Sequence, residues 1–219
     1  MDSQLLAYLQ SFLTERRREL FNEVLEERTR HITVVTEDVY QLHNTSAVMR
    51  SCDVFGIQDL HVIEARLGKK VDREIAMGAQ KWVDIHRHKD VSNCISTLKS
   101  KGYRIIATTP HGMATALEEF DISQPVALFF GAEKEGVSEE VIEAADENLK
   151  IPMYGFTESL NISVSAAIIL QNLVGRMRKK EIQWQLSEEE KRELQIKWTL
   201  KTIKRVDEII ERYKNEKIS

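Results

Sequence analysis

The chain has 219 residues and a formal net charge of −4 at pH 7, with 42% hydrophobic and 30% charged residues. This length suits one domain of ordinary size with some helical additions, and the hydrophobic fraction is sufficient for a real core. The negative balance argues against a protein held to nucleic acid by bulk positive charge, although local basic clusters are compatible with it.

Cysteine usage and hydropathy indicate the compartment. Cys52 and Cys94 provide neither a disulfide framework nor a metal-binding spacing, which favours two buried thiols in a reducing compartment. The N-terminus lacks the basic-then-apolar pattern of a signal peptide. The longest apolar helix candidate, ISVSAAIILQNLV, is too short and too polar to span a bilayer. We therefore expect a soluble, cytoplasmic protein that does not bind a membrane.

The predicted elements alternate between strand and helix. Residues 2–28 are expected to be helical, with an apolar face formed by Leu5, Leu6, Leu9, Phe12 and Leu13. The elements expected after this helix are, in chain order, a strand at 31–37, a helix at 44–56, a strand at 59–64, a Lys-, Arg- and Gly-rich loop at 65–82, a helix at 89–102, strands at 103–109 and 126–131, a helix at 138–146, a strand at 149–153 and a helix at 161–180.

The ends of several helices are marked by specific residues. Gly56 and Gly102 are typical helix stops, and Asp90 is a typical N-cap. Ser187 and Glu190 have the spacing of a capping box that opens a final helix.

The strand–helix alternation and the apolar strands predict an α/β fold with a parallel sheet covered by helices on both faces. The core is assigned to residues 31–180, with helical extensions at 1–30 and 181–219.

Several kinds of chemistry lack their sequence signature. No glycine-rich turn follows the first strand, which excludes the usual dinucleotide fold. The segment FFGAEKEGVS resembles a phosphate-binding loop, yet Val137 stands where the lysine should be, and Glu133 and Glu135 would lie against the phosphates. His86 and His88 are interpreted as surface residues, and no metal is expected.

Three segments carry a family resemblance. They are NTSAVMRSCDVFG, FFGAEKEGVS and IPMYGFTESLNISVSAAIIL, in this order along the chain. Together they resemble the three motifs of the SPOUT methyltransferases, and within them the TrmH-type branch, which methylates ribose 2′-hydroxyl groups of RNA with S-adenosylmethionine. The resemblance implies a deep trefoil knot, which the general rule against threaded loops would not suggest.

The resemblance also implies residue roles. Arg50 would act on the ribose hydroxyl, as a base or, since guanidinium keeps its proton, by stabilising alkoxide charge. Glu133 would orient Arg50, and Asn44 would belong to the active centre, although it could equally cap its helix. Ser159 and Asn161 would build the pocket. The cofactor contacts are expected from Thr108, Gly131, Ile151 and Leu160.

RNA contact is expected from basic clusters, and for each cluster a solvated face is the competing interpretation. The candidates are Arg16, Arg17, Arg18, Lys69, Lys70, Arg176 and Arg178. Family members work as dimers, so a homodimer is implied. The short flanking extensions resemble those of the tRNA enzyme acting on guanosine 18 of the D-loop. The alternatives to this function are 2′-O-methylation of ribosomal RNA, 2′-O-methylation of the tRNA wobble ribose, and a non-catalytic RNA-binding role on the same fold.

Overall fold

The computed structural model describes residues 3–39, 42–64, 78–110, 112–132 and 134–218. The predicted site residues Glu133, Lys69 and Lys70 lie outside the described residues. The chain divides into two compact units, one formed by Met1–Arg28 with Gln185–Ser219 and the other by Thr29–Trp184.

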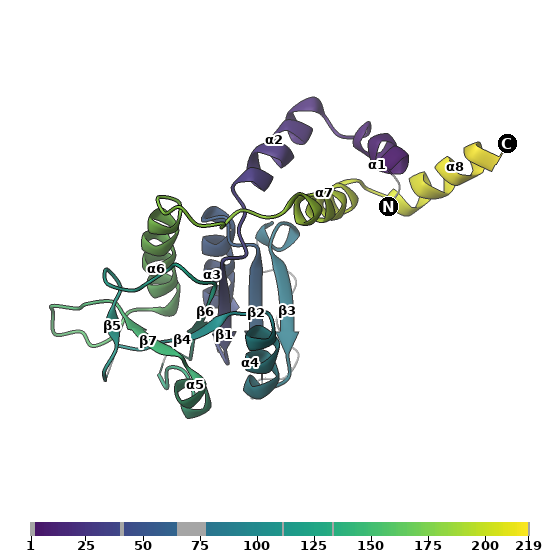
Figure 1. The fold of residues 1–219 in the computed structure, drawn as a ribbon. Helices are drawn as coiled ribbons and strands as arrows, with labels where there is room; N and C mark the ends of the chain where they lie inside the picture. Colours follow the sequence, from purple (N-terminus) through teal and green to yellow (C-terminus); the bar gives the residue numbers. More distant parts are fainter. Residues whose placement is uncertain (1–2, 40–41, 65–77, 111, 133, 219) are drawn as a thin grey trace. The chain divides into compact units, whose positions relative to one another are not determined.

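A parallel sheet forms the centre of the larger unit (Figure 1). Its strand order is β3-β2-β1-β6-β4-β7-β5, and every strand pair is parallel, as the sequence predicted. β1, β2 and β6 are buried at every position, because helices cover both faces of a parallel sheet. The strands are β1 Ile32–Glu37, β2 Asp59–Ile63, β3 Asp84–His88, β4 Arg104–Thr108, β5 Thr115–Ala116, β6 Val126–Phe130 and β7 Glu147–Lys150.

Helices cover the two faces of this sheet and create two hydrophobic cores. α3 (Leu42–Val54) and α6 (Ile162–Met177) pack on one face. α4 (Val91–Ser100) and α5 (Glu139–Ala144) pack on the other. Successive side chains of a strand point to opposite faces, so Val34 joins the first core and Val35 the second. The α/β class with helices on both faces is confirmed, whereas the knot stays a prediction.

Local capping explains where the helices of this unit begin and end. The Asp90 carboxylate accepts a hydrogen bond from the Asn93 backbone N–H at 2.7 Å, which caps α4 as expected. Gly56 and Gly102 follow α3 and α4 with φ of 78° and 84°, a conformation in which a side chain would be strained. These helix ends are confirmed.

Several sequence expectations for the elements of this unit were wrong. Residues 84–88 form β3, a strand that the apolar pattern does not predict, because its charged and histidine residues conceal it. Consequently His86 and His88 are half-buried strand residues, and not surface histidines. The last strand ends at Lys150 and does not continue to residue 153. The short β5 and the 3₁₀ helix η1 (Ala79–Lys81) were also not predicted.

Within its described residues, 3–28 and 185–218, the terminal unit contains four helices around a small core. The expected single helix over 2–28 is wrong: α1 (Ser3–Gln10) ends before Thr14, whose hydroxyl caps α2 (Glu15–Glu26). Ser187 and Glu190 form the predicted capping box of α7 (Glu188–Thr202), and α8 (Val206–Ile218) follows.

The core of the terminal unit is built around one tryptophan. Phe21 packs edge-on against Trp198, with 5.6 Å between ring centroids. The Arg28 guanidinium lies 5.4 Å from the centroid of the same ring. Long stretches from the two ends of the chain thus stabilise each other. None of the helices in the described parts of the chain is long and apolar enough to cross a bilayer.

Candidate active site

The loop after β6 folds back tightly on itself. The Gly136 backbone N–H donates to the Ala132 carbonyl at 2.8 Å. A Cβ atom on Gly131 would lie only 1.9 Å from the Gly136 carbonyl oxygen, and Gly136 itself has φ of 70°. Both glycines are therefore required by the backbone: the first by the close approach and the second by its left-handed conformation.

A buried carboxylate holds the far end of this loop. Glu37, at the end of β1 and 6% exposed, accepts a hydrogen bond from the Ser138 backbone N–H at 2.9 Å. The Ser138 hydroxyl in turn accepts from Val141 N–H and caps α5. The N–H groups of Gly136 and Ser138 are already hydrogen-bonded, and the Glu37 carboxylate lies at the junction with α5. The loop is therefore unsuited to bind phosphate groups, which agrees with the absence of a lysine at position 137.

Sequence reasoning missed Glu37. Its only signal was a carboxylate that ends an otherwise apolar strand segment, ITVVTE. A buried charged group needs a partner, and the partner here is 101 residues away in the chain.

A pocket of about 540 Å³ opens at the carboxyl ends of β4, β6 and β7. Ligands of open α/β sheets bind at such an edge. The Thr108 hydroxyl donates to the Phe129 carbonyl at 2.7 Å and joins the ends of β4 and β6 at the pocket wall. The structure places five predicted site residues in the lining of this one pocket: Thr108, Gly131, Ile151, Ser159 and Leu160.

Two further motif residues meet across 117 positions of the chain. Asn44 on α3 is 3% exposed, and its side-chain oxygen accepts a hydrogen bond from the Asn161 side-chain amide at 3.3 Å. Asn161 is also the N-cap of α6, because its side-chain oxygen accepts the Ser163 N–H at 2.8 Å. The first and third motifs are thus joined by a side-chain hydrogen bond beside the start of α6.

Arg50 takes a different position from the other motif residues. It is exposed on α3 and is not among the described residues that line the pocket. An exposed guanidinium suits a group that meets a substrate arriving from solution.

The basic residues differ in what their side chains do. Arg16, Arg17 and Arg18 are exposed on α2, and Arg16 pairs with Glu19 and Glu23 at 3.7 and 3.4 Å. Ion pairs of this exposed kind are weak and easily exchanged for other partners.

Arg176 is engaged inside the larger unit. Its guanidinium donates to the Leu117 carbonyl at 2.7 Å and to the Phe120 carbonyl. Arg178 is exposed and lies 4.9 Å from the centroid of the Trp184 ring. These contacts tie Arg176 to the loop after β5 and leave Arg178 as the more accessible cation of the pair.

Comparison with known proteins places this architecture in a family. Residues 31–171 match the model of the SpoU rRNA Methylase family. The chain is 38% identical to the tRNA (guanosine(18)-2′-O)-methyltransferase of Borreliella burgdorferi, over 91% of both chains. It is 41% identical to the enzyme of the same name from Thermus thermophilus, over 72% of this chain and 81% of the relative.

Solved structures agree with this assignment. The TrmH/SpoU tRNA modifying enzyme of A. aeolicus superposes with a TM-score of 0.78 at 34% identity, covering 86% of this chain and 98% of that one. The SpoU methyltransferase AviRb of Streptomyces viridochromogenes, solved with AdoMet, has the same fold, with a TM-score of 0.64, 22% identity and coverage of 72% and 65%. The chain belongs to the SpoU rRNA methylase family.

Proposed function

We propose that this protein transfers a methyl group from S-adenosylmethionine to a ribose 2′-hydroxyl of tRNA, at guanosine 18 of the D-loop. The observation that carries the proposal is the pocket, because residues from the second and third motifs and the end of β4 line one cavity. Support for the substrate comes from the relatives named tRNA (guanosine(18)-2′-O)-methyltransferase, one of which the chain matches over 91% of both lengths.

The pocket suits S-adenosylmethionine in size and lining. Its volume of about 540 Å³ lies within the range of roughly 300–1,000 Å³ typical of small-molecule sites. Ile151, Leu160 and Ile169 offer apolar contact for a purine ring. Gly131 leaves backbone exposed, and Glu135 and Glu158 bring carboxylates that are compatible with a cationic ligand. S-adenosylmethionine supplies an electrophilic methyl group on a positively charged sulfur.

The protein's own groups would then position the acceptor. Arg50 can donate hydrogen bonds to the ribose oxygen and stabilise the negative charge that develops on it, a role that keeps the guanidinium protonated. The hydrogen bond between Asn161 and Asn44 fixes the start of α6 against α3, the helix that carries Arg50. Positioning of this kind supplies much of the rate in a simple group transfer. Glu133 is retained as the proposed partner of Arg50.

We propose that RNA is held by exposed cations outside the pocket. Arg17, Arg18 and Arg178 are accessible, and Lys69 and Lys70 remain candidates from the sequence. Because the net charge of the chain is −4, we expect only a few phosphate contacts and an affinity that falls as salt rises.

A homodimer is the proposed assembly. Val164 and Ile168 are 45% and 39% exposed one turn apart on α6, and Leu160, also 39% exposed, both lines the pocket and faces solvent. A second copy packed on this face would cover the apolar side chains and close the open side of the pocket. Exchange of Val164 for glutamate should lower the molar mass measured by light scattering from that of a dimer to that of a monomer.

Methyl transfer to defined RNAs tests the proposed reaction. Purified protein would be incubated with labelled S-adenosylmethionine and unmodified tRNA, with a matched tRNA that carries 2′-deoxyguanosine at position 18, and with ribosomal RNA. We expect label only in the unmodified tRNA. The label should be in a dinucleotide that resists alkaline hydrolysis, since alkaline cleavage needs an unmodified 2′-hydroxyl.

The other outcomes separate the alternatives. Label in ribosomal RNA alone, or at the wobble ribose, would retain the chemistry and reject the substrate. Absence of label together with absence of S-adenosylmethionine binding in calorimetry would favour a non-catalytic RNA-binding protein.

Variants of Arg50 test its role. Arg50→Ala should abolish methyl transfer with unchanged S-adenosylmethionine affinity, and Arg50→Lys should restore little because an ammonium lacks the planar fork of donors.

A further inference from the structure

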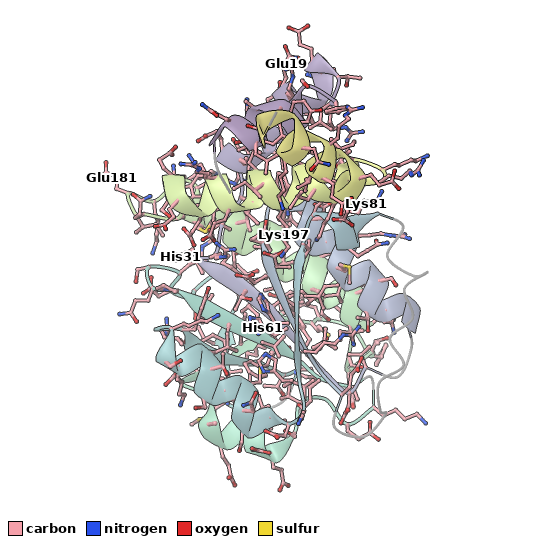
Figure 2. All side chains as sticks on the ribbon, turned by 90° about the vertical axis from the view of Figure 1, so that its right-hand side faces the viewer. Glu19, His31, His61, Lys81, Glu181 and Lys197 are labelled. Atoms are coloured by element: carbon pink, nitrogen blue, oxygen red, sulfur yellow. The ribbon has the colours of Figure 1, made fainter. Side chains whose placement is uncertain are left out.

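Three metal-ligating side chains converge on the sheet face that α4 covers, outside the pocket and on the face opposite to α6. His61 comes from β2, His88 from the end of β3, and Cys94 from α4. One ligand atom from each lies within 4.8 Å of the other two. His61 and Cys94 are buried and His88 is half-buried, and Figure 2 shows His61 among the strands of the sheet. The cluster therefore has a protected interior and one side towards solvent.

Hydrogen bonds orient the His88 ring towards the cluster. Its Nδ1 lies 3.2 Å from the Asn93 side-chain oxygen, so this nitrogen donates and carries the ring proton. Its Nε2 faces His61 Nδ1 at 2.8 Å and is left as an acceptor. Metal-binding histidines have this arrangement, with the second ring nitrogen held by an oxygen acceptor.

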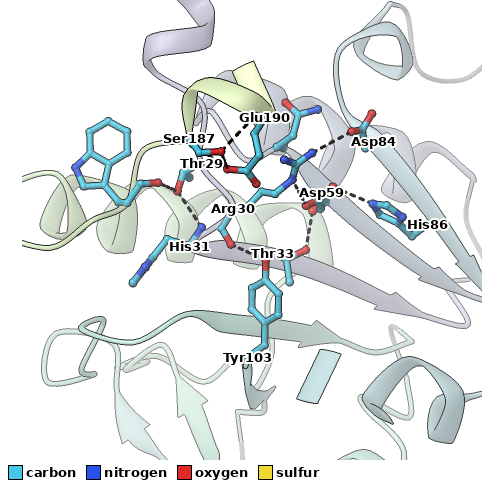
Figure 3. A network of polar contacts seen from close by, with 12 residues as sticks. Thr29, Arg30, His31, Thr33, Asp59, Asp84, His86, Tyr103, Ser187 and Glu190 are labelled. Atoms are coloured by element: carbon cyan, nitrogen blue, oxygen red, sulfur yellow. Dashed lines mark hydrogen bonds and ion pairs between the residues drawn. The ribbon is translucent and has the colours of Figure 1, made fainter. Parts of the chain in front are cut away.

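The third histidine on this face is held away from the cluster. His86 stacks on His61 with 4.6 Å between ring centroids, yet its Nε2 lies 2.8 Å from an Asp59 carboxylate oxygen. The other oxygen of Asp59 accepts a hydrogen bond from Arg30 at 3.0 Å, in the polar network of Figure 3. The Nε2 atom of His86 is thus committed to Asp59, and His86 is not counted among the ligands.

A carboxylate interacts with the proposed sulfur ligand. Burial, with a further contribution from the Glu37 carboxylate, raises the pKa of the Cys94 thiol to about 12, so this thiol keeps its proton until a metal binds. The same carboxylate favours a positive ion beside the sulfur, and a metal would displace the thiol proton on binding.

We propose that His61, His88 and Cys94 form a zinc site, with a water molecule as the fourth ligand on the solvent side of His88. Neutral imidazole and thiolate are ligands that zinc prefers, and three protein ligands together with one water molecule complete a tetrahedron. Tetrahedral zinc would place the two nitrogens about 3.4 Å apart, given Zn–N bonds of about 2.0–2.1 Å. The present separation is 2.8 Å, so the two rings need to part by about 0.6 Å, and His61 has to carry its proton on Nε2 in place of Nδ1. The three ligand atoms now lie within 4.8 Å of one another, and the sulfur would settle about 3.6 Å from each nitrogen. The site would link β2, β3 and α4.

Metal titration of the full-length protein tests this site. Protein without a histidine tag would first be treated with chelator and then titrated with zinc against a chromogenic chelator of known affinity. Cobalt would be added in a second experiment, because a cysteine ligand produces a sulfur-to-cobalt charge-transfer band in the near ultraviolet. We expect one equivalent of each ion and a clear charge-transfer band.

Matched variants decide which side chains bind. Cys94→Ser and His88→Asn should each weaken zinc binding at least tenfold, and Cys94→Ser should remove the charge-transfer band. Cys52→Ser, at the buried thiol on the opposite sheet face, should leave affinity and band unchanged. Because His88 is half-buried, its variant is the one best able to remain folded, which circular dichroism would verify.

Two results would overturn the proposal. One is a wild-type protein that removes no zinc from the chelator and shows no charge-transfer band with cobalt. The other is a band that persists in Cys94→Ser or disappears in Cys52→Ser. Neither result depends on methyl transfer, so failure of this site would be distinguishable from failure of the proposed function.

Discussion

Replacement of Gly131 by alanine tests the link between the backbone of the loop and ligand binding. The added Cβ would meet the Gly136 carbonyl oxygen at 1.9 Å, the Gly136 carbonyl carbon at 2.0 Å and the Val137 nitrogen at 2.1 Å. Real Cβ contacts essentially never fall below 3.0 Å, and all three atoms belong to backbone. The loop must therefore open by about 1 Å.

The expected cost follows from what the opening disrupts. Loss of the hydrogen bond from Gly136 N–H to the Ala132 carbonyl costs about 1 kcal/mol. Forcing extra volume into a packed site adds about 1–3 kcal/mol. We expect the free energy of unfolding of Gly131→Ala to fall by about 2–4 kcal/mol. Since Gly131 lines the pocket, we also expect S-adenosylmethionine to bind at least tenfold more weakly, about 1.4 kcal/mol.

Urea unfolding and isothermal titration calorimetry measure the two quantities. The matched control is Gly155→Ala, because a Cβ on Gly155 meets nothing within 4 Å; this variant should leave the stability nearly unchanged. If Gly131→Ala kept wild-type stability and affinity, the close approach of Gly131 to the Gly136 backbone would not constrain the pocket, and the requirement for glycine at position 131 would be refuted.

Substitutions at three further positions probe contacts that hold the structure together. Glu37→Ala removes the acceptor of the Ser138 N–H and should weaken S-adenosylmethionine binding about tenfold in calorimetry. Glu37→Gln retains an acceptor, and its affinity should lie between those of Glu37→Ala and the wild type. Equal affinities of all three proteins would refute a role for this hydrogen bond. Ser187→Ala should lower the stability of the terminal unit by about 1 kcal/mol in urea without changing cofactor affinity, because only a helix cap is lost. Arg176→Ala should destabilise the protein by about 2 kcal/mol, since two carbonyl groups lose their charged donor. A large fall in tRNA affinity at unchanged stability would instead identify Arg176 as an RNA contact.

Much of the local structure could be predicted from the sequence. Asp90, Gly102 and the Ser187–Glu190 pair mark helix ends because a cap depends on residues within one turn of it. The uniformly apolar segment 126–130 predicts a strand buried on both faces. The absence of a lysine at Val137 excluded a phosphate loop. Gly131, Ile151 and Leu160 in the motifs, and Thr108 outside them, could be named from the family resemblance before their positions were known.

Other features depend on residues that are distant in the sequence. β3 was missed because it is an edge strand that pairs with β2 alone and is only partly buried, so its sequence DIHRH lacks an apolar pattern. The bond between Asn161 and Asn44 spans 117 residues, and that between Ser138 and Glu37 spans 101.

The sequence by itself therefore determined the fold class and several helix ends, because apolar periodicity and capping act over a few neighbouring positions. The candidate site residues came from the resemblance of three segments to a known family. Only the tertiary structure decided which side chains meet: that Glu37 holds the loop, that Arg176 binds carbonyl groups, and that His61, His88 and Cys94 converge. The physical reason is that the order of strands in a parallel sheet, β3-β2-β1-β6-β4-β7-β5, differs from their order in the chain, so contacts across it follow the packing of the whole core.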